Sequence, residues 1–191
     1  GVALVRGLVQ SFAAARSGLA AMEFAFIGPV MIFLFFAIVE GSNALSVSRK
    51  VSLAVNTLAD LASQETELTA AQTSDLFDGV EQIIGQGSIS AQINLVSLVL
   101  DPDDDDEVVV HWSRDNGGSQ PYAPGSTYSG LADASLLDAS SSLVVAEIQF
   151  TYTPPLTKSL ISTINLNKMA TRWALRSARV QFCTSPGVCT S

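Results

Sequence analysis

Charged side chains are scarce in this sequence of 191 residues, and so are histidine and cysteine. Only 15% of the residues are charged, against about 25% in an ordinary soluble domain. The 10 lysines and arginines are outnumbered by 18 acidic residues, which excludes a nucleic-acid-binding protein that relies on net positive charge. A single histidine and two cysteines argue against a zinc site, since zinc is commonly held by four ligands.

Catalytic motifs are also missing. His111 has no cysteine or serine motif near it, and the spacing Gly-x-Ser-x-Gly of a nucleophile elbow does not occur. The glycines at 85 and 87 indicate a helix stop and a turn rather than a phosphate-binding loop. We therefore expect a protein that is not an enzyme and takes no cofactor. An anchored enzyme whose active site converges on His111 with several carboxylates remains the competing interpretation.

What the chain does have is one long apolar stretch, residues 19–39, in which Glu23 is the sole ionisable side chain. As a helix this stretch is about 32 Å long, close to the hydrocarbon thickness of a bilayer. Arg6 and Arg16 precede it without an acidic residue, and positively charged flanks stay in the cytoplasm. The pattern predicts a single-pass protein with a cytoplasmic N-terminus and an exported C-terminal domain.

The helical pattern continues beyond the apolar stretch. Valines and leucines recur at intervals of three and four, which is typical of one buried helix face, at Val47, Val51, Val55 and Leu58. We therefore predict a basic leader over 1–18, one helix over 19–64 with its membrane half at 19–39, and an exported domain over 65–191. Pro29 lacks a backbone N–H and is expected to kink or loosen the helix.

The exported domain changes from a helical to a strand period. Thr69 and Gln72 form a capping-box pattern that predicts a helix over 70–84. Four alternating runs then predict strands that each place their apolar residues on one face: from Ile89 to Leu95, Val108–Val110–Trp112, from Ala146 to Tyr152, and Met169–Thr171–Trp173–Leu175. The class is α+β, with a four-stranded antiparallel sheet that has one face covered by the long helix. Residues 114–142 are predicted to form a long surface loop, with a helical turn possible at 135–137.

Three further features of the exported domain allow predictions: the two cysteines, an acidic run and a group of arginines. Cys183 and Cys189 flank a Ser-Pro-Gly turn, and an exported chain meets an oxidising compartment, so we predict a disulfide; two free thiols are the alternative. The acidic run from Asp101 to Glu107 is read as a solvated hairpin loop, with a calcium site as the alternative. The last strand and its continuation carry three arginines, Arg172, Arg176 and Arg179. We expect them either to contact the acidic surface of a neighbouring subunit or to pair internally, for example with Glu147.

The N-terminal segment carries the strongest motif. A short basic leader ends in Gly18, the fifth residue after it is Glu23, and Phe24 follows at the start of a long apolar run. This signature resembles the type IV prepilin cleavage site, and in particular the TadE-like proteins of the tight-adherence (Flp, type IVb) pilus. Supporting similarity lies at Glu40–Gly41, Leu68–Ala71, Val110–Ser113 and Val144–Ile148.

The resemblance implies a pilin-like inner-membrane minor pilin or pseudopilin with a periplasmic domain. A prepilin peptidase would cut between Gly18 and Leu19, and the new amino group of Leu19 is a candidate for N-methylation. Other pilins and the assembly platform would be its partners, at the tip, base or shaft of a pilus that serves cell adhesion. Phe24 departs from the tyrosine that major pilins of this class often have.

Glu23 is the residue through which the resemblance implies that subunits assemble. A lone carboxylate in a bilayer costs several kcal/mol unless a cation neutralises it. In type IV pilin assembly the amine of one subunit neutralises the carboxylate of its neighbour, and Pro29 lies in the same packing helix. Two alternatives stay open: Glu23 is solvated near Arg16, or the whole chain is an uncleaved envelope protein with an adhesive or sensing domain.

Overall fold

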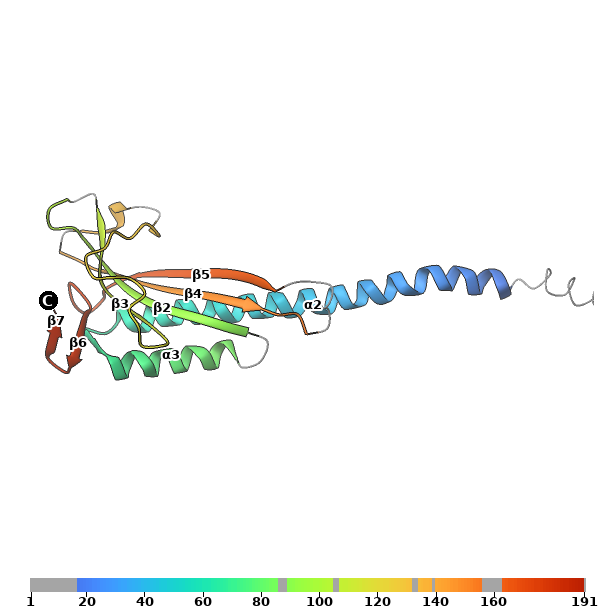
Figure 1. Cartoon of the computed structure of the whole chain (residues 1–191), viewed down its shortest axis with the longest axis horizontal. Helices are drawn as coiled ribbons and strands as arrows, with labels where there is room; N and C mark the ends of the chain where they lie inside the picture. The colour runs from blue at the N-terminus through green and yellow to red at the C-terminus, as the bar shows by residue number, and fades with distance from the viewer. Residues whose placement is uncertain are drawn as a thin grey trace, which may run out of the picture. The chain divides into compact units, whose positions relative to one another are not determined.

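The computed structural model describes residues 17–85, 89–104, 107–131, 134–138, 140–155 and 163–190. The chain divides into two compact units, residues 1–43 and 44–191. Helix α2 (Ser17–Ser63) supplies residues to both units. The predicted helix over 19–64 therefore exists, and the division between the units falls inside it. Figure 1 shows α2 and the strands that lie alongside its C-terminal part.

Helix α2 runs without interruption through Pro29. Its C-terminal part, from Ala44 onward, places a stripe of small and branched side chains on one face at the helical spacing of three and four. These side chains are almost fully buried: Val51, Ala54, Val55, Leu58, Ala59 and Ala62. They form one core cluster with side chains of the sheet, so the helix covers one sheet face as predicted.

Helix α3 (Ala70–Ile84) follows after a short strand. The backbone N–H of Thr69 donates to Gln72 Oε1 at 2.8 Å, and Gln72 N–H donates back to Thr69 Oγ1 at 3.3 Å, which is the predicted capping box. Gly85, with a φ of 88°, ends the helix in a conformation that glycine adopts without strain. The buried side of α3 joins the same core through Phe77, Val80 and Ile84.

Four strands form the main sheet: β2 (Ile89–Leu100), β3 (Val108–Asp115), β4 (Leu143–Tyr152) and β5 (Ile164–Trp173). Their order is β3-β2-β4-β5, and every neighbouring pair is antiparallel. A long N-terminal apolar helix followed by a domain with this sheet confirms the predicted α+β class. The middle strands carry most of the core because they have a neighbour on both sides.

Two predicted sheet faces are wrong in detail. A register shift between Ser97 and Leu98 lies opposite β3, so Val110 and Trp112 pack in different core clusters instead of on one face. On β5 it is Ala170 that faces the helix, while Met169 and Trp173 are 48% and 42% exposed. Met169 and Trp173 therefore lie on the other face of this edge strand, where the hydroxyl of Tyr128 is 3.7 Å from the sulfur of Met169.

The second face of the sheet is partly covered as well, which the sequence did not predict. Residues 119–131 fold back over it, and Thr127 forms an isolated bridge with Val109. The rings of Tyr122 and Tyr128 belong to a second cluster on the sheet face opposite the helix. This cluster also contains Val96, Val145 and the buried Leu137. The predicted loop thus begins only after β3, and its suggested helical turn is the short 3-10 helix η1 (Ala134–Leu136).

A small second sheet closes the domain and was also missed. It contains β1 (Glu67–Thr69), β6 (Gln181–Ser185) and β7 (Val188–Thr190) in the order β1-β6-β7. The pair β1–β6 is parallel and joins residues more than a hundred positions apart, as in Leu68 opposite Phe182. The hairpin β6–β7 places Cys183 opposite Cys189.

Candidate assembly helix and processing site

The residues of the predicted processing site all lie in the N-terminal part of α2. Gly18 and Leu19 are in its first turns and are exposed, as are Glu23, Phe24 and Pro29. A Cβ placed on Gly18 would have nothing within 4 Å. The peptide bond between Gly18 and Leu19 is therefore not covered by any described residue of this chain.

The apolar side chains of this part of α2 are exposed all round the helix. The large ones are 39–76% exposed: Leu19, Met22, Phe24, Phe26, Ile27, Val30, Met31, Ile32, Phe33, Leu34, Phe35, Phe36 and Ile38. The helix is long and apolar enough to cross a membrane, which is compatible with a single-pass membrane protein. A surface of this size in a soluble monomer would be unusual, so it calls for lipid or for other apolar helices around it.

Glu23 is the acidic group of this surface. It lies four residues after Leu19, and residues four apart in a helix are neighbours on one face. An amino group created at Leu19 by cleavage would thus lie about one turn from the carboxylate of the same chain. Arg16, the alternative partner considered from the sequence, lies outside the described residues.

Phe24 and Gly28 form a local contact on the same helix. A Cβ on Gly28 would lie 3.6 Å from the ring of Phe24, one turn earlier. The ring therefore lies against a residue without a side chain, which lets it follow the helix surface closely. A larger residue at position 28 would meet this ring.

The predicted disulfide is present between Cys183 and Cys189. The carboxylate of Glu67 lies beside it and accepts a hydrogen bond from the backbone N–H of Gly187 at 3.2 Å. Glu67 and the two cysteines are the one group among the described residues with the spacing of a metal site. Because the sulfurs are bonded to each other, they are not the thiolates that a metal requires.

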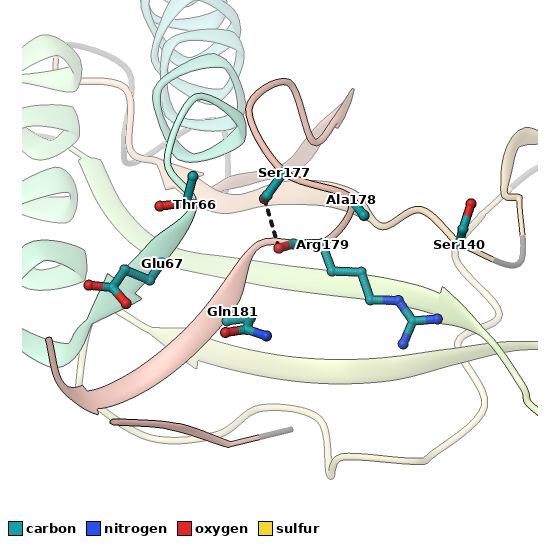
Figure 2. Close-up of a pocket in the computed structure, with 7 residues that line it drawn as sticks. All are labelled: Thr66, Glu67, Ser140, Ser177, Ala178, Arg179 and Gln181. Carbon is teal, nitrogen blue, oxygen red and sulfur yellow. Dashed lines mark hydrogen bonds between the residues drawn. The ribbon is translucent and has the colours of Figure 1, made fainter. Parts of the chain in front are cut away.

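A polar depression of about 470 Å³ lies next to the small sheet (Figure 2). Its walls are mostly polar and come from the start, the middle and the end of the domain sequence: Thr66, Glu67, Ser140, Ser177, Ala178, Arg179 and Gln181. The hydroxyl of Ser177 donates to the backbone oxygen of Arg179 at 2.8 Å, which fixes the bend that presents this arginine. Among its described lining residues, no nucleophile is paired with a base.

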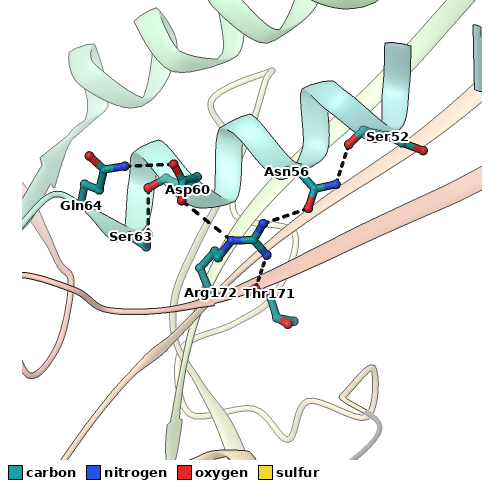
Figure 3. A network of polar contacts seen from close by, with 7 residues as sticks. All are labelled: Ser52, Asn56, Asp60, Ser63, Gln64, Thr171 and Arg172. Carbon is teal, nitrogen blue, oxygen red and sulfur yellow. Dashed lines mark hydrogen bonds and ion pairs between the residues drawn. The ribbon is translucent and has the colours of Figure 1, made fainter. Parts of the chain in front are cut away.

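Arg172 bridges β5 and the C-terminal part of α2 (Figure 3). Its Nη2 donates to Asn56 Oδ1 at 3.0 Å, and its Nε lies 3.9 Å from Asp60 Oδ1. Of the two interpretations offered for Arg172, internal pairing is confirmed, with Asp60 rather than Glu147. The sequence signal that was missed is the spacing of Asn56 and Asp60, one turn apart on the helix face beside β5.

Glu147 lies on the opposite face of the sheet and has other partners. Its carboxylate accepts hydrogen bonds from Tyr122 at 2.9 Å, from Asn94 at 3.1 Å and from the hydroxyl of Tyr128. Burial, with the added effect of the Glu147 carboxylate, raises the pKa of Tyr122 to about 12, and the pKa of Tyr128 is raised for the same reasons. The cluster ties residues 119–131 to the sheet.

His111 is a partly buried imidazole near the charge of Arg179. Burial lowers its pKa below the ordinary value of 6.5, and the nearby charge of Arg179 lowers it further. Its Nδ1 is buried and has no hydrogen-bond partner among the described residues. The charge that acts on the imidazole is thus a cation rather than a carboxylate that would orient it.

The acidic run between β2 and β3 forms a hairpin connection. Asp101 N–H donates to the backbone oxygen of Glu107 at 2.8 Å, and Asp101 Oδ1 accepts from Asp103 N–H at 2.8 Å. Asp105 and Asp106 lie outside the described residues, so the calcium alternative remains a prediction without a test.

The similarity found between this chain and known proteins lies in α2. Nothing among the curated proteins or the solved structures matches the chain at a significant level. Residues 18–60 match the family model of the TadE-like proteins. These residues hold the predicted processing motif, the apolar surface and most of the packed part of α2. The predicted resemblance is thereby confirmed over residues 18–60, where this part of α2 is similar to the TadE-like proteins.

Proposed function

We propose that this chain is a minor pilin or pseudopilin of a tight-adherence (Flp) type IV pilus. The TadE-like match associates the chain with the assembly of that pilus. In the proposal a prepilin peptidase cuts between Gly18 and Leu19 at the cytoplasmic face of the inner membrane. The domain after α2 lies in the periplasm, and the mature chain then joins other pilins on the assembly platform.

The observation that carries the proposal is the single carboxylate of Glu23 on an apolar helix surface that no described residue covers. A carboxylate in hydrocarbon needs a cationic partner. Cleavage after Gly18 creates one at Leu19, four residues away. The amine of the same chain can neutralise Glu23 while the chain waits in the membrane, and exchange of that amine for the one of a neighbour fixes the axial position of the two helices.

The first test is the N-terminal sequence and intact mass of the chain from cells with a working pilus system. We expect a start at Leu19, with or without an added methyl group. Gly18→Leu removes the small residue before the cleaved bond and should retain residues 1–18. Since a Cβ at Gly18 meets nothing, this variant leaves the helix intact; Gly41→Ala, also in open space, is the matched control and should be cleaved normally.

The second test separates cleavage from assembly. Glu23→Ala should be inserted and cleaved but should be absent from isolated pili, because the amine-carboxylate pair is lost. A native start upstream of Gly18 would reject processing and favour an uncleaved envelope protein with an adhesive or sensing domain. Normal incorporation of Glu23→Ala would reject the role of the carboxylate.

A further inference from the structure

The two edges of the main sheet differ in whether another segment forms hydrogen bonds with them. Residues 125–128 cover the edge at β3: Val110 N–H donates to Ser126 O at 2.9 Å, and Tyr128 N–H donates to Val108 O at 2.8 Å. Among the described residues no segment pairs with the outer edge of β5. Exposed strand edges are commonly blocked in soluble proteins because they attract other chains.

The strand at this open edge carries apolar and basic side chains on its face toward α2, and it contains no acidic residue. Leu166 is 38% exposed and is followed on the same face by Lys168 and Arg172. On α2, Arg49 lies about two turns before Asn56, the residue that binds Arg172, and so on the side of the helix that borders β5. Arg172 has Asp60 as its partner, whereas Arg49 and Lys168 form no ion pair with a described residue.

The other side of the domain has the opposite charge. Helix α3 exposes acidic side chains on one face and contains no lysine or arginine: Asp75, Asp78 and Glu81. Glu81 accepts a hydrogen bond from Asn116 at 2.9 Å, and Asp75 and Asp78 are without an ion pair within the part of the chain that the structure describes. Figure 1 shows β5 and α3 on the two sides of the C-terminal part of α2.

We infer that the open β5 edge of one copy, with Arg49 and Lys168, docks onto the acidic face of α3 in a second copy. Complementary charge on two sides of one domain favours head-to-tail contact, which repeats from copy to copy. A symmetric contact of two β5 edges would instead bring like charges together. The inference rests on the proposed function as its setting and deepens it, since it names a partner and the two surfaces that meet.

The contact is tested by crosslinking the full-length chain in its own membranes. Asn167→Cys on β5 and Gln82→Cys on α3 are both exposed positions, and together they should give a ladder of dimers and larger species with a bismaleimide. Either cysteine alone should give no ladder. The yield should fall as salt rises from low concentration toward 1 M, because screening then acts within about 3 Å.

Charge exchange provides the decisive comparison. Arg49→Glu with Lys168→Glu should lower the crosslink yield several-fold, and so should Asp75→Lys with Asp78→Lys. All four substitutions in one chain should restore the yield, which also shows that the variants fold. Arg49→Lys with Lys168→Arg is the matched control and should leave the yield unchanged.

A ladder that ignores the charge reversals overturns the inference, and so does the absence of a ladder in the chain that carries both introduced cysteines and its native charges. So does crosslinking exclusively to other proteins. The crosslink does not require cleavage after Gly18, whereas the proposed function is read from the N-terminal sequence. The two can therefore fail separately.

Discussion

The two parts of helix α2 have the same backbone and different surroundings. Before Ala44 the helix is apolar on every side, and its large side chains are exposed. After Ala44 only one stripe is apolar enough to be buried, and it is covered by the sheet and α3. Helix formation is thus local, whereas burial needs a partner. The second part has its partner within the chain, and the first part requires lipid or other helices.

The largest change in stability is expected from a cavity in the packed part of α2. Leu58→Ala removes a fully buried side chain from the core and should lower the free energy of unfolding of the unit over residues 44–191 by about 2–5 kcal/mol. Phe33→Ala, in the uncovered part, should leave that value unchanged. Chemical denaturation of the detergent-solubilised chain, followed by tryptophan fluorescence, measures both. Equal losses in the two variants would contradict the division of the helix.

A pair of arginine substitutions sharpens the comparison, because Ile32 and Leu53 are each 60% exposed. Ile32→Arg places a charge in the middle of the apolar stretch and should cost about 2.5–3.5 kcal/mol of membrane insertion. Leu53→Arg meets water and should insert normally. Alkaline extraction of membranes distinguishes the two, and identical extraction would show that the first part does not span a bilayer.

The smallest effect concerns the polar tie between α2 and β5. Arg172→Met removes the hydrogen bond to Asn56 and the contact with Asp60, which are partly exposed, and should cost about 0–1 kcal/mol of unfolding free energy. The same denaturation measurement applies, with Arg176→Met on the following bend as the control. A loss as large as that of Leu58→Ala would mean that this tie, rather than the apolar stripe, holds α2 on the sheet.

Local signals in the sequence were sufficient for the two helices and for the disulfide. The spacing of apolar residues predicted α2, the pair Thr69 and Gln72 predicted the start of α3, and the turn between the cysteines predicted their pairing. Gly18, Glu23 and Phe24 identified the motif that the TadE-like match then covered. Each of these features depends on residues within a few positions of one another, so a linear pattern is enough to specify it.

Long-range contacts decided the rest. The sequence alternation on β5 was read in the wrong sense because both of its faces carry apolar residues, and only the position of α2 selects Ala170 for the core. The parallel pair β1–β6, the cover of Tyr122 and Tyr128 over the second sheet face and their bonds to Glu147 join distant segments. The sequence by itself determined which segments are helical, apolar or turn-forming, since those properties are local. Tertiary structure alone decided which faces are buried and which edge stays open, since burial depends on what the chain brings back to each surface.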